Sequence, residues 1–395
     1  MPSILHGVTV LDFGRYIAAP FCCQLLADLG ADVIRVERPG GEADRQRGPW
    51  TPNGESLYFA AINRNKRAIT LNVRHKKGAD LLAGLVAKSD VLVHNLPASR
   101  AQALRLDYPT IQSHNPKLVY LAISGFGAAG PRANDPALDA VFQAMSGGMA
   151  ANGAAGQSPF PSHIPYVDFG TGVYGALAIV SALYHRKTTG AGQAIDLALY
   201  NTALSFIVGY GALADFAHNG VARQNVGADF IYAVGGTFPA SDGYVTVNCV
   251  TDAMFEDLCK VIARPDLAQD PRLKGDGPRY QHRAIVNAAI APWVAQRTAR
   301  EAVETLAKGG VPAGPVQTVA ALAADPQAQA AAAIHQLDQP GIGPVPVSAF
   351  VPRMQGAAPI ARPAPAVGQH NAEIYKALLG LSTQQLQQLA AEGAL

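Results

Sequence analysis

The feature that most constrains the fold is the alternation of short β-like runs with helix-like runs through the first 125 residues. Apolar runs rich in β-branched residues recur there, separated by helical patterns. The runs are Val8–Phe13, Ala31–Glu37, Arg67–Val73, Asp90–His94 and Leu118–Ser124. Strands that alternate with helices pair in parallel within an open sheet. The sequence therefore predicts an α/β fold with a large, Rossmann-like open-sheet domain.

The pattern changes after residue 220, which predicts a second, smaller domain. Gly220–Phe230 has the composition of a linker, and a strand at Tyr244–Asn248 is then followed by several helical stretches. We expect residues 1–220 to form the N-terminal part of the large domain and residues 221–325 a smaller α+β domain. Residues 326–395 would return to the large domain, with the Pro-rich run Gly341–Pro365 as an extended segment.

Composition narrows the class of protein. Hydrophobic residues make up 49% and charged residues 15% of the chain, which excludes disorder as the main state. The net charge of +2 is too small for bulk binding of nucleic acid. The four cysteines show no CxxC or zinc-site spacing, which favours reduced, buried thiols. Met1–Phe13 lacks the pattern of a signal peptide, and the apolar run Val173–Tyr184 is too short to span a bilayer. We expect a cytoplasmic protein with no nucleic-acid or membrane partner.

One literal dinucleotide-binding motif occurs, Gly125-Phe-Gly-Ala-Ala-Gly130, directly after a predicted strand. Pro131 follows at the point where a phosphate-binding helix would begin. No strand ends in an acidic residue about 20 residues further on, as nucleotide ribose recognition requires. The context favours a tight glycine turn over nicotinamide binding.

Asp168 stands out because it lies between a Gly/Pro-rich stretch, Ala150–Pro165, and a long apolar helix expected over Thr171–Arg186. Two interpretations fit this position. The carboxylate could simply cap the helix, which is the more common case. Alternatively, it could be a nucleophile beside amides, such as that of Gly170, that stabilise an oxyanion. The residues alone leave both open.

Short motifs occur in a fixed order along nearly the whole chain. They are Leu5–Phe13, Ala18–Pro20, Leu25–Pro39, Asn63–Arg67, Asp90–Asn95, Ser124–Gly127, Gln143–Gly147, Asp168, Thr189–Gln193, Gly310–Pro315 and Gly368–Asn371. As an ordered set they resemble the class III CoA-transferases, the formyl-CoA transferase or CaiB–BaiF family, which is related to the 2-methylacyl-CoA racemases. The resemblance implies the CaiB/BaiF fold and a homodimer of interlocked chains.

The resemblance also implies a reaction. Coenzyme A would move from an acyl-CoA thioester to a carboxylic acid, here a small dicarboxylate, through covalent anhydride and thioester intermediates on Asp168. Transfer between two carboxyls of one diacid would use the same chemistry. The CoA thioester would be a co-substrate, with no permanently bound cofactor and no metal. Arg15, Tyr16 and Tyr166 are candidates to hold a distal carboxylate.

The CoA contacts implied by the resemblance all fall in the first domain. They are Arg15, Tyr16, Ile17, Arg38, Leu71, Val73, Arg74, Asn95, Leu96, Arg100 and Arg105. The position where relatives commonly carry an arginine is Ala103 in this chain, so Arg100 or Arg105 would replace it. The glycine-run loop and the glutamine of formyl-CoA transferases are not seen, and Ile17 stands near that glutamine's position. This makes formyl or oxalyl specificity a weaker expectation.

Two rival functions remain at this point. A racemase needs a histidine to move the α-proton, and Leu138 stands where that histidine would be, so His163 or another histidine would have to replace it. A non-catalytic CoA-binding protein is the other rival, and the retained Asp168 argues against it.

Overall fold

The computed structural model describes residues 3–154, 156–222, 225, 227–354 and 362–395. Parts of the predicted linker and of the predicted Pro-rich return segment fall outside these ranges. The chain divides into two compact units. The first comprises Met1–Gly148, Ser162–Ala214 and Gln329–Leu395, and the second comprises Met149–Pro161 and Asp215–Ala328. The sequence placed residues 149–161 in the large domain, whereas their contacts group them with the second unit.

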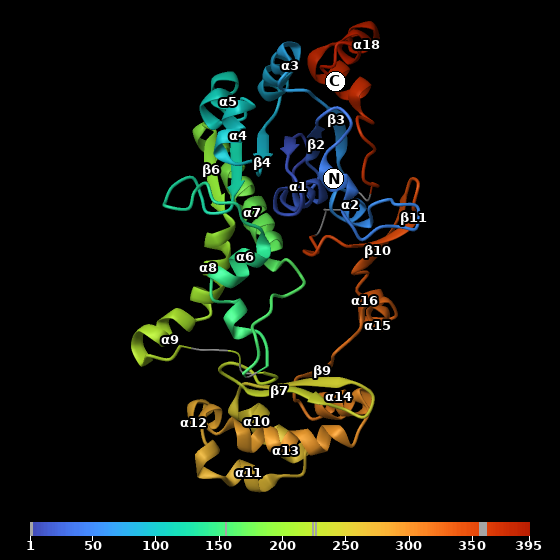
Figure 1. Ribbon diagram of the computed structural model, residues 1–395. Helices are drawn as coiled ribbons and strands as arrows, with labels where there is room; N and C mark the ends of the chain where they lie inside the picture. The colour runs from blue at the N-terminus through green and yellow to red at the C-terminus, as the bar shows by residue number, and fades with distance from the viewer. Residues whose placement is uncertain (1–2, 155, 223–224, 226, 355–361) are drawn as a thin grey trace. The chain divides into compact units, whose positions relative to one another are not determined.

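A six-stranded parallel sheet forms the centre of the first unit (Figure 1). Its strands are β1 (Thr9–Phe13), β2 (Asp32–Glu37), β3 (Arg67–Thr70), β4 (Val91–His94), β5 (Val119–Ser124) and β6 (Gln193–Ala198). The order is β3-β2-β1-β4-β5-β6, and every neighbouring pair is parallel. The central strand β1 places Val10 beside Val33 of β2 and Val91 of β4. The predicted parallel α/β sheet is therefore confirmed.

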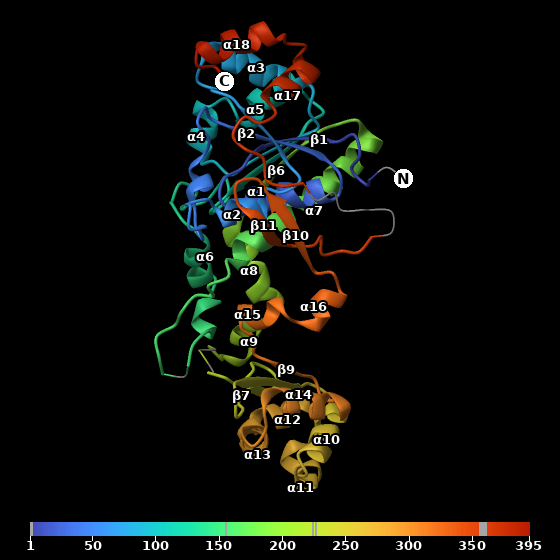
Figure 2. The same cartoon turned by 90° about the vertical axis from the view of Figure 1, so that its right-hand side faces the viewer.

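Helices cover both faces of this sheet (Figures 1 and 2). One face packs against α1 (Ala18–Asp28), α6 (Asp139–Met145), α7 (Tyr166–Thr189) and α8 (Leu199–Gly209). The other packs against α3 (Lys76–Ala87), α4 (Ala98–Ala103), α5 (Tyr108–His114), α17 (Asn371–Leu379) and α18 (Thr383–Ala391). The helices do not cover the carboxyl ends of the strands and the loops that follow them, which is where open parallel sheets generally bind ligands.

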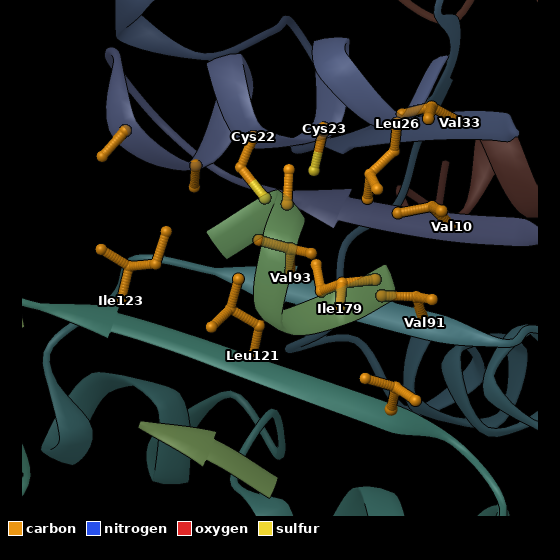
Figure 3. Close-up of a cluster of buried hydrophobic side chains, with 14 of the residues drawn as sticks. Val10, Cys22, Cys23, Leu26, Val33, Val91, Val93, Leu121, Ile123 and Ile179 are labelled. Carbon is orange, nitrogen blue, oxygen red and sulfur yellow. The ribbon is translucent and has the colours of Figure 1, made fainter. Parts of the chain in front are cut away.

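Figure 3 shows why α1 is apolar on one face. Cys22, Cys23 and Leu26 of α1 point toward the sheet, where they meet a row of strand valines, and Ile179 of α7 enters the same layer. All four cysteines of the chain are buried and unpaired, as the sequence predicted. Burial raises the pKa of the Cys23 thiol well above its usual value. These thiols are core residues.

The helix α7 is longer than the sequence indicated, because it begins at Tyr166 and not at Thr171. Gly172 and Gly175 allow α7 to lie close to α1. A Cβ added at Gly172 would meet the carbonyl oxygen of Ala18 at 3.0 Å, and one added at Gly175 would meet the sulfur of Cys22 at 3.0 Å. Within the described ranges, α7 is the one helix whose length and composition would let it cross a membrane. However, 44% of its most apolar window is buried inside the protein, and a single such helix is weak evidence for a span.

The rest of the first unit comes from shorter elements. They are α2 (Leu57–Ile62), the 3-10 turn η1 (Ala43–Gln46), and the antiparallel strands β10 (Ile334–Gln339) and β11 (Gly343–Ser348), whereas the 3-10 turn η2 (Met149–Ala151) already belongs to the second unit. The β10–β11 hairpin packs on α2 around Leu337, Val345 and Val347. The chain then returns to the sheet edge, where Asn371 accepts a hydrogen bond from the backbone N–H of Thr70.

The second unit has its own core around a three-stranded antiparallel sheet. Its strands are β7 (Val234–Pro239), β8 (Tyr244–Cys249) and β9 (Ala313–Pro315). Its helices are α10 (Asp252–Val261), α11 (Pro265–Gln269), α12 (Asp276–Gln281), α13 (Arg283–Ala295), α14 (Ala299–Lys308) and α15 (Val319–Ala323), with the 3-10 turn η3 (Pro271–Leu273). The division between the units falls within α9 (Ala212–Asn219) and within α16 (Pro326–Ala330). The sequence identified β8 but missed β7, whose two consecutive glycines weaken the β pattern.

Candidate active site

A basic cavity of about 380 Å³ opens at the carboxyl ends of β1, β2, β3 and β4. The lining residues are Phe13, Arg15, Val36, Glu37, Arg38, Pro39, Glu42, Leu71, Asn72, Val73, Arg74, Leu96, Arg100, Leu104, Leu106 and Gly393. The structure thus brings together most of the residues that the resemblance implied for CoA contact. Of these, Tyr16, Ile17, Asn95 and Arg105 do not line the cavity, and the expected nucleophile Asp168 does not line it either.

The four arginines of the cavity differ in how far their charge is already neutralised. Arg15 forms a two-pronged salt bridge with Glu42, at 2.6 and 2.7 Å. Arg38 donates from Nε to the carbonyl oxygen of Gly41, makes only a long ion pair with Glu42 at 3.9 Å, and is otherwise largely exposed. Within the described ranges, Arg74 and Arg100 form no salt bridge. Arg38, Arg74 and Arg100 therefore carry the cationic groups that an anionic ligand could use.

Arg105 is exposed, has a left-handed backbone with φ 57°, and does not line the cavity. Arg100, one turn earlier on α4, does line it and lies close enough to Arg15 for the two charges to interact. Of the two arginines that could stand in for the residue missing at Ala103, Arg100 is the one at the cavity.

The turn between β1 and α1 borders the cavity. In its first two residues, Gly14 and Arg15, every backbone N–H and carbonyl group is hydrogen-bonded to a side chain. Gly14 donates its N–H to Asp12 Oδ1 at 2.8 Å and accepts at its carbonyl from Arg35 at 3.3 Å. The side chain of Asn95 accepts from the N–H of Arg15 at 2.8 Å and donates to its carbonyl at 2.7 Å. Asn95 thus lies behind the cavity wall and fixes it.

Tyr16 completes this turn in a left-handed conformation, with φ 61°, which costs a non-glycine residue energy. Its N–H donates to Asp44 Oδ2 at 3.3 Å, and its ring is 44% exposed. Asp44 is in turn held by the fully buried Arg35, whose Nη2 donates to both of its carboxylate oxygens, at 2.8 and 2.9 Å. Strain of this kind persists only where surrounding contacts over-determine the backbone.

A second buried ion pair supports the same turn. Lys66 Nζ donates to Asp12 Oδ2 at 2.8 Å, to the carbonyl of Pro20 at 2.8 Å and to Asn63 at 3.0 Å. Both charged side chains of the pair are completely buried. Asp12 lies in the motif Leu5–Phe13, and Asn63 and Lys66 lie in the motif Asn63–Arg67. The contacts between these two distant segments were not predicted, because no local pattern reports them.

Asp168 lies in the first turn of α7 and is half-buried. Of the two interpretations of this residue, the N-cap is wrong: the N-cap position belongs to Pro165, which has no side-chain cap hydrogen bond. Within the described part of the chain, the Asp168 carboxylate has neither a hydrogen bond nor a salt bridge. Gly170 lies beyond the first turn, where its N–H belongs to the helical ladder, so it is not the oxyanion donor we expected.

The surroundings of Asp168 are aromatic and acidic. Phe169 packs edge-on against Phe21 of α1, with ring centroids 4.9 Å apart. Tyr58 of α2 is close enough that the charges of Asp44 and Asp168 contribute, after burial, to a pKa well above the usual tyrosine value. Asp139 of α6 accepts the backbone N–H of Asp168 at 2.9 Å.

Burial, followed by the neighbouring charge of Asp139, raises the pKa of Asp168 to about 7. A half-buried carboxyl with such a pKa, and without a partner in the described part of the chain, is a candidate for covalent chemistry, since a more basic carboxylate is a better nucleophile. The sequence missed Asp139. Its signal was the i, i+4 spacing to Gln143 at the start of a helix.

The other motifs carry no comparable geometry. After Gly130 no helix begins until Asp139, so the glycine motif forms a turn and not a dinucleotide-binding element. Leu138 and His163 are both exposed. Within the described ranges no three metal-ligating side chains gather in one place.

Comparison with known families decides how this geometry is assigned. Residues 5–371 match the model of CoA-transferase family III. The chain belongs to this family, and it is a CoA-transferase.

Relatives cover nearly the whole chain. The succinyl-CoA–D-citramalate CoA-transferase of Chloroflexus aurantiacus is 32% identical, with 99% of this chain and 98% of the relative aligned. The formyl-CoA:oxalate CoA-transferase of Rhodopseudomonas palustris is also 32% identical, over 100% of this chain and 98% of the relative. A CaiB/BaiF family protein from Brucella suis has the same fold, with a TM-score of 0.82 and 33% identity over 96% of this chain and 100% of that one. Overall identity therefore does not choose between these acids.

Proposed function

We propose that this CoA-transferase moves CoA from an acyl-CoA thioester to a small dicarboxylic acid, with Asp168 as the nucleophile. The observation that carries the proposal is the state of the Asp168 carboxylate: it is half-buried, at the start of a helix, and without a hydrogen-bond partner in the described part of the chain. Burial and the charge of Asp139 raise its pKa to about 7, so near neutral pH part of the population carries the basic carboxylate that attack on a thioester needs.

The reaction needs no redox change. The Asp168 carboxylate attacks the thioester carbonyl, the C–S bond breaks, and CoA thiolate leaves with an acyl-aspartyl anhydride behind. The thiolate then attacks the aspartyl carbonyl, which releases the donor acid and forms an aspartyl-CoA thioester. The acceptor carboxylate displaces the thiolate from this thioester to give a second anhydride. Attack of the thiolate on the acceptor's carbonyl releases the new acyl-CoA and the free carboxylate. Each step breaks one acyl bond as it forms another.

In this proposal the cavity beside the β1–α1 turn takes the phosphorylated end of CoA. Arg38, Arg74 and Arg100 supply cationic donors, and charge-assisted contacts to phosphate are among the stronger hydrogen bonds. Arg15 is engaged by Glu42, so its part is to shape the wall rather than to meet a phosphate. Arg105 has no part in it.

The acceptor is inferred from chemistry and from the relatives. A relative that uses succinyl-CoA and citramalate supports a dicarboxylate, and transfer between two carboxyls of one diacid fits the same steps. Tyr16, exposed on the fixed turn, and Tyr166, at the start of α7, are the side chains we propose for contact with a distal carboxylate. Formyl or oxalyl transfer stays the weaker expectation, since Ile17 replaces the glutamine typical of that branch.

We further propose that the protein acts in the cytoplasm as a homodimer of interlocked chains, with no permanently bound cofactor. Exposed apolar side chains on α7 support a dimer: Val173 is 52%, Leu177 61% and Tyr184 73% exposed in the single chain. A row of this kind along one helix is typical of a protein–protein contact.

The test is intact-mass spectrometry after brief incubation with succinyl-CoA. We expect an adduct on Asp168 that hydroxylamine removes and that Asp168→Ala abolishes. A panel of CoA esters and acids, read by mass spectrometry, then identifies donor and acceptor. Persistent transfer by the alanine variant, or transfer with no adduct under any donor, would contradict the proposal. Exchange of the α-proton in deuterated water without CoA transfer would favour a racemase, and CoA binding with no adduct and no transfer would favour a non-catalytic protein.

A further inference from the structure

The start of α7 has an unusual cap. A helix leaves its first N–H groups unpaired, and a side chain at the N-cap position normally accepts one of them. Here the N-cap residue is Pro165, which has no side chain able to do so. The acceptor comes instead from another helix: Asp139, the first residue of α6, accepts the N–H of Asp168 at Oδ2, at 2.9 Å.

In this arrangement one carboxylate caps the helix and another is available for reaction. In sequence terms Asp168 is itself well placed to cap α7, and a capping carboxylate would be held by hydrogen bonds against the backbone. Here Asp139 provides the cap, and the Asp168 side chain has no such contact in the part of the chain that the structure describes. The residue is fixed through its backbone while its carboxylate stays available.

Asp139 is itself locked in place. It is buried, at 7% exposure, and its other oxygen accepts from Gln143 Nε2. Gln143, almost completely buried, also reaches the loop before α7: its Oε1 accepts from the N–H of Ser162 at 2.8 Å. Its Nε2 also approaches the Ser162 carbonyl at 3.3 Å. One glutamine thus ties the cap to the segment that leads into the helix.

The charge of Asp139 acts on Asp168 as well. Two titratable groups interact with Asp168, namely Asp139 from α6 and Tyr58 from α2, and Tyr166 on α7 itself is close enough to feel the charge of Asp139. Burial is the larger cause of the raised pKa of Asp168 and the charge of Asp139 the second. Both tyrosines have pKa values raised by burial, so they are neutral at physiological pH. Removing the charge of Asp139 would therefore lower the pKa of Asp168.

We propose that Asp139 is a positioning residue that caps α7 in place of Asp168, so that the nucleophile is held by its backbone and its carboxylate remains free. Gln143 fixes Asp139 for this task. The inference rests on the proposed function, because it assigns Asp139 a role toward the nucleophile named there.

Three variants test it, read by the rate of adduct formation on Asp168 as a function of pH. Asp139→Ala removes both the hydrogen-bond acceptor and the charge. We expect the rate at pH 8 to fall about 10- to 100-fold, because a small misplacement of a reacting group costs that much. The midpoint of the pH profile should also move to lower pH, while the KM for the CoA donor stays within about threefold.

The double variant Asp139→Asn/Gln143→Glu is the matched rescue. The new amide keeps an oxygen for the Asp168 N–H, and its NH2 group meets the new carboxylate, which still accepts from Ser162. We expect this variant to recover most of the rate at pH 8. Asp139→Asn alone should not, because it sets the NH2 group of the new asparagine against the NH2 group of Gln143. Asp135→Asn, at an exposed aspartate paired with Arg132, is the control and should match the wild type.

The outcomes separate the inference from the proposed function. If the wild type forms no adduct at Asp168 at any pH, the proposed function has failed and the inference with it. If the wild type forms the adduct and Asp139→Ala leaves both rate and pH midpoint unchanged, only the inference is overturned. The same holds if the alanine variant is impaired but the double variant is impaired equally. Should Asp139→Ala fail to fold, the contrast between the single and double Asn variants decides the matter.

Discussion

Two segments at the active site are built in opposite ways. In the β1–α1 turn, the N–H groups of Gly14, Arg15 and Tyr16 and the carbonyls of Gly14 and Arg15 are all bonded to side chains. At the start of α7 one side chain also holds the backbone, yet the Asp168 carboxylate has no partner in the described part of the chain.

The difference concerns what each segment has to do. In buried ion pairs such as Lys66–Asp12 and Arg35–Asp44 the cost of desolvation can exceed the attraction between the charges, so the pairs are poor evidence for stability as such. We interpret these ion pairs as holding a strained turn in one conformation, so that binding a ligand does not have to order it. A nucleophile needs the reverse, because each hydrogen bond to its carboxylate would have to be given up on attack.

The largest effect we predict is at the free group. Asp168→Asn keeps the shape of the side chain but removes the nucleophile, so CoA transfer should fall on the order of 10⁴-fold or more. CoA affinity should stay close to that of the wild type, because the arginine cavity is untouched. Steady-state transfer assays and calorimetric titration with CoA measure the two quantities. A comparable loss of CoA affinity would show that the carboxylate is part of the binding site and not only of the reaction.

The next prediction concerns the fixed segment. Lys66→Met leaves Asp12 charged and buried without its partner, and breaking such a pair costs about 3–5 kcal/mol of folding free energy. Urea unfolding followed by circular dichroism measures the loss. Lys88→Met, at an exposed lysine, is the control and should change little. Equal unfolding midpoints for the two variants would mean that the buried pair does not hold the turn.

A smaller effect is expected at the cavity. Arg100→Ala should weaken CoA binding about 10- to 100-fold, since hydrogen bonds to charged groups contribute about 1.5–3 kcal/mol. Arg105→Ala should leave CoA affinity unchanged, because Arg105 does not line the cavity. Calorimetric titration of both variants with CoA measures this contrast. The reverse order of effects would reassign the arginine that replaces the residue missing at Ala103.

The fold was largely predictable, for a physical reason. Strands such as Val91–His94 are buried on both faces, so their apolar runs are visible in the sequence. Where the pattern is weaker, prediction failed: β7 contains two glycines, and the start of α7 was hidden because Tyr166 and Asp168 do not continue its apolar pattern.

The site was predictable in its residues but not in its connections. The basic residues of the cavity came from the family resemblance, and the structure gathers most of them. Which arginine is free and which is paired depends on Glu42, and which carboxylate caps α7 depends on Asp139. Such contacts join segments far apart in the chain, so no local pattern reports them.

The smallest effect tests the electrostatic state of Asp168 through stability. Burial and the charge of Asp139 raise its pKa from 3.8 in the unfolded chain to about 7 in the folded protein. The folded state thus prefers the protonated form. Stability from this group is fully present below pH 3.8 and is lost progressively until pH 7, above which the folded protein carries an unfavourable charge.

Asp168→Asn substitutes a permanently neutral group of the same shape and should therefore stabilise the protein more at pH 8 than at pH 5. The gain is on the order of 1–3 kcal/mol at pH 8, because the carboxylate keeps some contact with solvent and is partly screened. Urea unfolding at the two pH values measures it. A nucleophile left without partners should cost stability when it is charged. If the variant were equally or less stable than the wild type at pH 8, solvent or a bound ion would have to satisfy the Asp168 carboxylate. The contrast with the β1–α1 turn would then be weaker than the contacts indicate.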